Sequence, residues 1–172
     1  MTKRLVLNLM GPDQPGIVDN LADVIAAHGG NWEQSSMARL GGNFAGILMI
    51  SVADEDADEL VKVLESLDST CLSVTIAPPK IIPRTGTVVD LEIVGQDHVG
   101  IVHDISHVLA DLKVNVDEFE SYVEPASVSG GNVFRAHVCI RVPDGLDVDE
   151  VRDKLENIAS DLMIDLNFQV EG

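Results

Sequence analysis

An internal repeat limits the fold of this chain more than any other feature. The segment Gly11–Val18 (GPDQPGIV) returns 84 positions later as Gly95–Val102 (GQDHVGIV). The same shift relates the apolar residues that precede the segment, because Leu5, Leu7 and Leu9 match Val89, Leu91 and Ile93. The matches keep their order along the chain, so we predict two copies of one domain.

The second copy contains extra residues. Gly41-Gly42-Asn43 matches Gly130-Gly131-Asn132 at a shift of 89 positions, so about five residues are inserted around Glu124 to Gly130. Insertions of this size belong in loops. Three prolines between the copies indicate an extended connector. We therefore predict a first domain over 1–77, a proline-rich linker over 78–85 and a second domain over 86–172.

Hydrophobic periodicity predicts the order βαββαβ in each copy. In the first copy, strands are expected at 5–9, 31–40, 43–52 and 72–76, and helices at 17–28 and 57–67. In the second, a strand ends at Val94, helices cover 100–112 and 147–160, and strands cover 115–123, 133–142 and 163–170. This order predicts an α+β fold in which two helices cover one face of an antiparallel sheet.

The opposite face of the first sheet is expected to be apolar, since it carries Val6, Met10, Ile47 and Met49. Such a face is expected to pack against the other domain or another chain.

The charge of the chain argues against two classes of partner. Acidic residues number 29 against 11 basic ones, which gives a formal net charge of −18. This charge repels phosphate backbones and anionic lipids, so direct nucleic-acid or membrane binding is not expected. The apolar run Leu5–Met10 is too short for a signal peptide or a membrane span, which favours a cytoplasmic protein. Cys71 and Cys139 lack metal-site spacing and are expected to be reduced thiols with apolar neighbours in strands.

No enzyme class has a specific motif here. The chain lacks a phosphate-binding loop and a nucleophile elbow, so no catalytic residue and no cofactor is predicted. His103 and His107 are four residues apart, a spacing that can hold a metal. However, Ile101 and Ile105 mark the buried side of the same helix, so both histidines are expected on its polar face. A metal-assisted hydrolase built on these histidines remains an alternative, but no metal site is predicted.

The pattern G-x-D-x-x-G-I-V, followed by an asparagine at the next strand, resembles the ACT domain. Two copies that span the chain resemble the glycine cleavage system transcriptional repressor group. The resemblance implies ferredoxin-like domains with sheets joined side by side. It also implies amino-acid effectors bound near the strand-to-helix loop, at an interface between ACT units. In the repressor group, it implies action on a separate transcription factor.

The resemblance implies two ligand sites, one in each copy. The first would use Gly11, Asp13, Gln14, Gly16, Ile17 and Asn31, and the second Gly95, Asp97, His98, Gly100, Ile101 and Asn115.

Physical chemistry gives these positions two interpretations. A helix N-terminus presents free N–H groups to a carboxylate, an aspartate accepts bonds from an ammonium group, and an asparagine can donate and accept. Alternatively, the aspartates are helix N-caps, the glycines are turn residues and the asparagines form local bonds at strand starts.

The two copies differ within the implied sites. Gln14-Pro15 is replaced by His98-Val99, so equal occupancy is not assumed, and His98 introduces the hypothesis of pH-dependent binding. We predict a non-enzymatic, amino-acid-binding regulatory protein that modulates a transcription factor in glycine-type metabolism. The alternative is a ligand-independent interaction module that regulates an enzyme or transcription factor. The expected partners are a small amino acid and a transcriptional regulator, and a homodimer is an open possibility.

Overall fold

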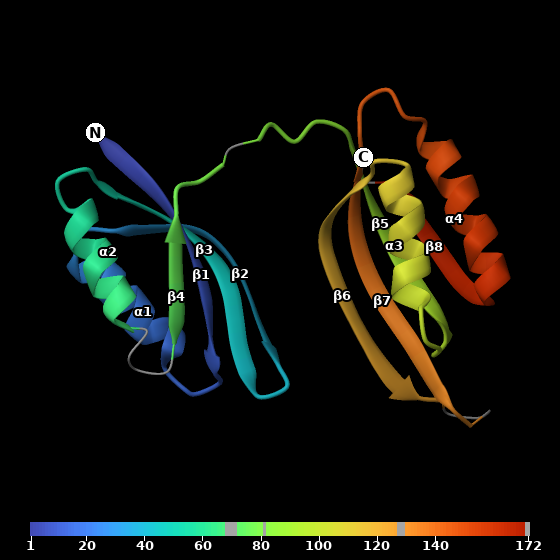
Figure 1. Cartoon of the computed structure of the whole chain (residues 1–172), viewed down its shortest axis with the longest axis horizontal. Helices are drawn as coiled ribbons and strands as arrows, with labels where there is room; N and C mark the ends of the chain where they lie inside the picture. The colour runs from blue at the N-terminus through green and yellow to red at the C-terminus, as the bar shows by residue number, and fades with distance from the viewer. Residues whose placement is uncertain (68–71, 81, 127–129, 171–172) are drawn as a thin grey trace. The chain divides into compact units, whose positions relative to one another are not determined.

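The computed structural model describes residues 1–67, 72–80, 82–126 and 130–170. The chain divides into two compact units, Met1–Ile82 and Pro83–Gly172. In each one, two helices accompany a four-stranded sheet (Figure 1).

The first unit has the element order βαββαβ, as the periodicity predicted. Its elements are β1 (Thr2–Pro12), α1 (Ile17–Ala27), β2 (Asn31–Leu40), β3 (Asn43–Ala53), α2 (Ala57–Ser66) and β4 (Ser73–Ala77). The strands are antiparallel to their neighbours and lie in the order β2-β3-β1-β4. The edges of the sheet are therefore β2 and β4.

The second unit repeats this topology. Its elements are β5 (Thr87–Gln96), α3 (Ile101–Asp111), β6 (Asn115–Pro125), β7 (Asn132–Val142), α4 (Val148–Leu162) and β8 (Ile164–Val170). The strand order β6-β7-β5-β8 again places the central strands between two antiparallel edges. Two ferredoxin-like α+β units are therefore confirmed.

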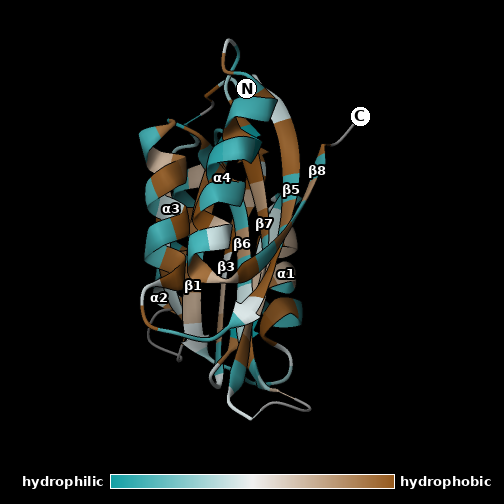
Figure 2. Cartoon of the chain, turned by 90° about the vertical axis from the view of Figure 1, so that its right-hand side faces the viewer, coloured by the Kyte–Doolittle hydropathy of each residue, from teal (hydrophilic) through white to brown (hydrophobic). Residues whose placement is uncertain are grey.

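Each unit has its own hydrophobic core between the sheet and the helices. Alternate residues of a strand face opposite sides, and on β1 the buried set is Leu5, Leu7 and Leu9. These leucines belong to one buried cluster with residues from both helices, such as Leu21 on α1 and Leu60 on α2. The helices of the second unit are amphipathic in the same way, with polar and apolar residues along α3 and α4 (Figure 2). No helix in the described part of the chain is long and apolar enough to cross a membrane.

The open faces of the two sheets differ in chemistry. The first sheet exposes apolar side chains there, as predicted, with Met10 59% and Ile47 56% exposed. In the second sheet, the strand registers place a charged residue and a cysteine where Val6 and Met49 stand in the first. These equivalents are Asp90 and Cys139. The predicted covering of the first open face stays a prediction.

Both units have a β-bulge at the same place. The register between β2 and β3 shifts between Trp32 and Gln34, which leaves Glu33 as the extra residue. In the second unit, the register of β6 shifts between Val116 and Glu118, so Asp117 is the extra residue. A bulge bends its strand and redirects the extra side chain, and here that side chain is acidic in both units.

The two bulges recruit different arginines. The Glu33 carboxylate forms an ion pair with Arg4 of β1, at 3.0 Å. The Asp117 carboxylate forms one with Arg141 of β7, at 2.7 Å. The two counterions therefore come from different strands of equivalent sheets.

The predicted match between the two glycine pairs is wrong by one residue. Phe44 pairs with Gly11, and Phe134 pairs with Gly95, so the hairpin strands are related by a shift of 90 positions rather than 89. The second hairpin is longer because β6 continues to Pro125, beyond the predicted end at Val123. The extra residues thus extend the strands as well as the loop.

Candidate functional site

The loop between β1 and α1 is fastened to the hairpin of its unit. The backbone N–H of Asp13 donates to the carbonyl oxygen of Gly42, at 2.9 Å, and Arg39 forms an ion pair with the Asp13 carboxylate. In the second unit, the N–H of Asp97 donates to the carbonyl oxygen of Asn132, also at 2.9 Å. The two backbones are therefore held alike, and the surroundings of the two carboxylates differ.

Strand register explains this difference in surroundings. Arg39 pairs with Phe44, and the equivalent residue of the second unit, which pairs with Phe134, is Val123. Asp97 has no ion pair within the described residues of the chain, whereas Asp13 has one. The loop of the second unit therefore presents the less compensated negative charge.

A glycine is the N-cap of the first helix in each unit. Gly16 is the N-cap of α1 with φ 90°, and Gly100 is the N-cap of α3 with φ 101°. A side chain is strained in this left-handed region, which explains the glycines. The alternative that Asp13 and Asp97 are the N-caps is wrong, because the glycines occupy that position without a side-chain cap. The first N–H groups of each helix thus lie next to a cap residue that has no side chain.

The isoleucine of each predicted residue set packs against its own unit and does not point outward. Ile17 is half-buried and Ile101 is buried. A Cβ atom at Gly95 would lie 3.0 Å from the Cα of Ile164, so close packing against β8 requires glycine at this position. The structural interpretation therefore accounts for Gly95, and Gly11 is buried within β1.

Asn31 and Asn115 lie far from the loops of their own units. Asn31 pairs with Ser51, which pairs in turn with Arg4 near the start of β1. Gly11 is seven residues further along β1, which corresponds to about 23 Å at the usual strand rise. Asn115 stands at the same level of the second sheet. A single unit therefore does not bring its asparagine and its loop together.

Asn115 takes part in a polar cluster at the bulge. Its Nδ2 donates to the Asp117 carboxylate at 2.5 Å, and that carboxylate also accepts from Arg141. Arg84 adds a third contact at 3.4 Å, and the Asp117 side chain is only 6% exposed. Burial tends to raise the pKa of Asp117, but the hydrogen bonds from Arg141 and Asn115 and the charges of Arg141 and Arg84 outweigh it and lower this pKa.

Sequence reasoning did not single out Asp117. The signal available to it was an acid two residues after the matched asparagine in both copies, Glu33 and Asp117. The bulge that turns this residue into the centre of a cluster appears only in the strand register.

A cavity of about 450 Å³ lies beside the loop of the first unit. Two of the predicted site residues, Gln14 and Ile17, line it. Its full lining is Gln14, Ile17, Asn20, Leu21, Asp23, Val24, Leu67 and Leu72. In the second unit, a separate cavity of about 390 Å³ includes Gly95 and its neighbour Gln96.

The histidines of α3 lie on its exposed side, as predicted. The rings of His103 and His107 stack with centroids 5.9 Å apart, and both side chains are largely exposed. His98 is half-buried in the loop before the helix, with Nδ1 3.3 Å from the carbonyl oxygen of Val99. Within the residues that the structure describes, no group of three His, Cys, Asp or Glu side chains is arranged to hold a metal ion.

The predicted apolar surroundings of Cys139 are wrong. Cys139 pairs across the sheet with Asp90 on one side and Glu118 on the other, so it lies among charged residues on the open face. The strand alternation assigns it to the face opposite the core, which apolar neighbours along the chain concealed. Cys71 lies outside the described residues.

Comparisons with known proteins agree with this architecture. Two family models, each described as an ACT domain, match residues 3–76 and 89–160. The structure of an unknown protein from Galdieria sulphuraria is similar over 100% of both chains, with 27% identity and a TM-score of 0.90. A structure described as a "putative glycine cleavage system transcriptional repressor" covers 99% of this chain and 98% of its own, with 17% identity and a TM-score of 0.72. A search of curated proteins finds no match. The chain belongs to the ACT domain family and consists of two such domains in tandem.

Proposed function

We propose that this tandem ACT protein is a non-enzymatic regulator. It binds an amino acid at the loop between the first strand and the first helix of a unit and signals to a protein partner. The observation that carries the proposal is the start of the helix after each loop. There, a glycine without a side chain occupies the N-cap, at Gly16 and at Gly100. The free N–H groups and the positive end of the helix dipole favour a carboxylate at this place.

The ammonium group of the ligand needs a second, negative contact. Asp97 supplies one without an ion-pair partner among the described residues, whereas Arg39 neutralises Asp13. His98 is half-buried in the same loop of the second unit and adds a polar group. We therefore propose that the second loop provides the stronger charge complement for a zwitterion, and that the first loop relies more on its amide groups.

The asparagines reach the proposed sites only if the edge of one sheet pairs with the edge of another. Asn31 and Asn115 lie on the edge strands β2 and β6, at the end opposite to the loops. If such an edge pairs antiparallel with an edge from another copy of the chain, the asparagine of one sheet approaches the loop of the other. A homodimer of this kind is part of the proposal and accounts for the residue set that the family resemblance implies.

The partner proposed for the signal is a transcriptional regulator in glycine-type amino-acid metabolism. The fold likeness to a structure described as a repressor supports a role in transcription. The formal charge of −18 disfavours direct contact with DNA, so the chain would act through another protein in the cytoplasm. A ligand would shift the population of arrangements that this partner recognises.

One observation favours a second candidate, a ligand-independent interaction module. The open face of the first sheet exposes Met10 and Ile47 in a chain with a high negative charge. An exposed apolar patch of this kind can bind a partner without any small ligand. In that case, partner binding would be the same with and without amino acids.

Calorimetric titration of the full chain with glycine, serine and the other common amino acids tests the proposal. Binding should be saturable and should weaken in Asp97→Ala for a site in the second unit. It should change the fluorescence of Trp32 only where the β2 edge of another copy lies against the occupied loop, because Trp32 is far from the loop of its own unit. Asp90→Ala is the matched control, since it removes an exposed carboxylate of the same unit away from the loop. If no amino acid binds to the folded, ligand-free protein, the sensor function is refuted and the interaction module becomes the better explanation.

A further inference from the structure

The cavity of the first unit has walls suited to an apolar group. It lies between α1, the residue that follows α2 and the residue that precedes β4, and its volume is about 450 Å³. This size falls within the range of small-molecule sites in proteins. Five of its lining residues are aliphatic: Ile17, Leu21, Val24, Leu67 and Leu72.

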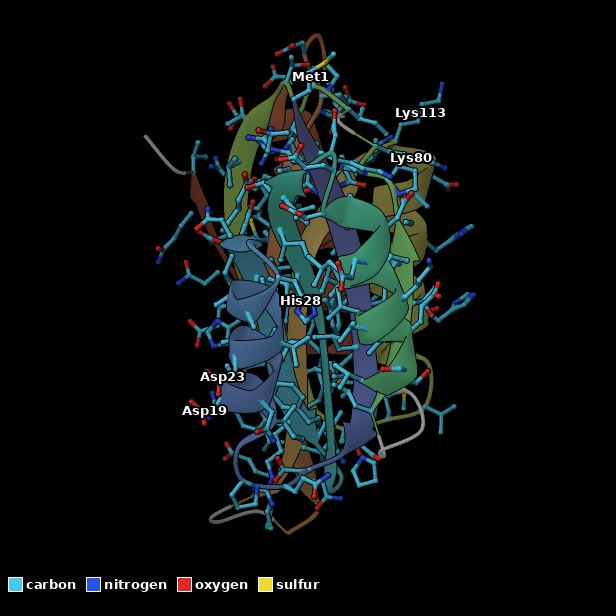
Figure 3. All side chains as sticks on the ribbon, turned by 90° about the vertical axis from the view of Figure 1, so that its left-hand side faces the viewer. Met1, Asp19, Asp23, His28, Lys80 and Lys113 are labelled. Carbon is cyan, nitrogen blue, oxygen red and sulfur yellow. The ribbon has the colours of Figure 1, made fainter. Side chains whose placement is uncertain are left out.

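Polar groups are present at one side of this cavity. Gln14 and Asn20 both line it, and neither side chain forms a hydrogen bond within the described part of the chain. A Cβ atom added at Gly16 would lie 3.8 Å from Nδ2 of Asn20, so this amide is close to the start of α1. Asp19 and Asp23 project from the side of α1 turned away from α2 (Figure 3), and Asp23 also contributes to the lining of the cavity, further along α1. The amides of Gln14 and Asn20 are therefore the polar groups of the lining nearest the helix start.

From this arrangement we infer that the first unit selects an amino acid with a large aliphatic or aromatic side chain. The side chain occupies the cavity, the carboxylate lies at the N-terminus of α1, and the amides of Gln14 and Asn20 bind the polar end. The inference rests on the proposed amino-acid-binding function and names the class of ligand. Glycine or serine would leave most of the apolar wall without a contact.

The second unit is built differently at the equivalent place. Its second helix, α4, has 15 residues against 10 in α2, and the added turn brings Ala159 and Leu162 into the core. The counterpart of Asn20 is Asp104, which His103 engages at 2.9 Å. The apolar selectivity is therefore assigned to the first unit alone.

The test is calorimetric titration of the full chain with leucine, phenylalanine, glycine and serine, in wild type and three variants. Val24→Phe fills the cavity, and Asn20→Ala removes an amide from an exposed position that the fold does not need. Ala26→Phe is the matched control, since it places the same ring on an exposed position of α1 outside the cavity. Circular dichroism confirms that each variant is folded.

We expect leucine or phenylalanine to bind at least about tenfold more tightly than glycine, because each methylene that enters an apolar pocket contributes about tenfold or more. Val24→Phe and Asn20→Ala should each weaken this binding, and Ala26→Phe should not. If Val24→Phe does not fold, Asn20→Ala decides the matter. Equal binding of glycine and leucine, or leucine binding that Asn20→Ala leaves unchanged, refutes the cavity as the selective site and leaves the proposed function intact. If none of these amino acids binds, while others do, the inference fails alone; if no amino acid binds, both fail.

Discussion

The ion-pair cluster at the second bulge should make Asp117 a stability determinant of its unit. The Asp117 side chain is 6% exposed and Arg141 is 21% exposed, so Asp117→Ala leaves a largely buried guanidinium without its counterion. Hydrogen bonds to charged groups and the cost of an uncompensated charge together suggest a loss of about 3 kcal/mol. The equivalent change in the first unit, Glu33→Ala, involves an arginine that is 51% exposed and should cost about 0.5 kcal/mol.

Native-state amide hydrogen exchange measures this difference in each unit separately. Amides at the centre of β7 report the opening of the second unit in Asp117→Ala, and amides at the centre of β3 report the first unit in Glu33→Ala. Because the two residues occupy equivalent bulges, the comparison measures the combined effect of burial and of the additional partners of Asp117. Similar losses in the two variants, or a loss below about 1 kcal/mol in Asp117→Ala, would refute the reasoning.

The pH dependence of the Asp117 contribution has a definite sign. The pKa of Asp117 is lowered in the folded chain from its ordinary value of 3.8. A carboxyl with a lowered pKa stabilises the folded state above its unfolded pKa, and this stabilisation is lost as pH falls through the folded value. The difference between wild type and Asp117→Ala should therefore be constant from pH 7 to pH 5 and should shrink below pH 3.8. A difference that grows on acidification would contradict the assigned cause.

Three further substitutions should lower stability in urea unfolding. Leu7→Ala removes a fully buried side chain and should cost about 3 kcal/mol, seen as an earlier transition of Trp32 fluorescence in the first unit. Gly100→Ala forces a side chain to φ 101° and should destabilise the second unit by about 1 kcal/mol. Ala110→Gly should also cost about 1 kcal/mol, but only through the lower helix propensity of glycine. Arg152→Gln removes a guanidinium that lies 4.8 Å from the Phe168 ring centroid and should cost about 0.5 kcal/mol, measured by circular dichroism.

Much of the fold could be predicted because local patterns and tertiary structure agree in this chain. The bounds of β2, Asn31 to Leu40, coincide with the segment that the alternation and the glycine pair predicted. The core leucines of β1 were visible as an alternating triplet in both copies. The strand register was harder to predict from the sequence. A shift of one residue changes few matches between the two copies, but it changes which residues pair across the hairpin.

The candidate site was predicted less completely than the fold. The loop and its glycines follow from a short motif, whereas the distance between the loop and Asn31 depends on strand pairing. The ion pair of Asp13 with Arg39 joins a loop residue to a residue of β2, and no sequence spacing rule relates the two. For the same reason, the cluster around Asp117 could not be deduced from the sequence before the bulge was known.

The shared bulge also shows how much freedom the sheet leaves to the ion pair beside it. Both halves keep an acidic residue at the bulge, but Arg4 serves one half from its first strand and Arg141 serves the other from its third. The residue of the second half that is equivalent to Arg4 is Val88. The residue of the first half that is equivalent to Arg141 is Ser51. The same acidic bulge is therefore compatible with an arginine on either of two strands that pair with each other. The backbone irregularity thus requires an acidic side chain and a nearby base, and it does not fix the strand that provides the base.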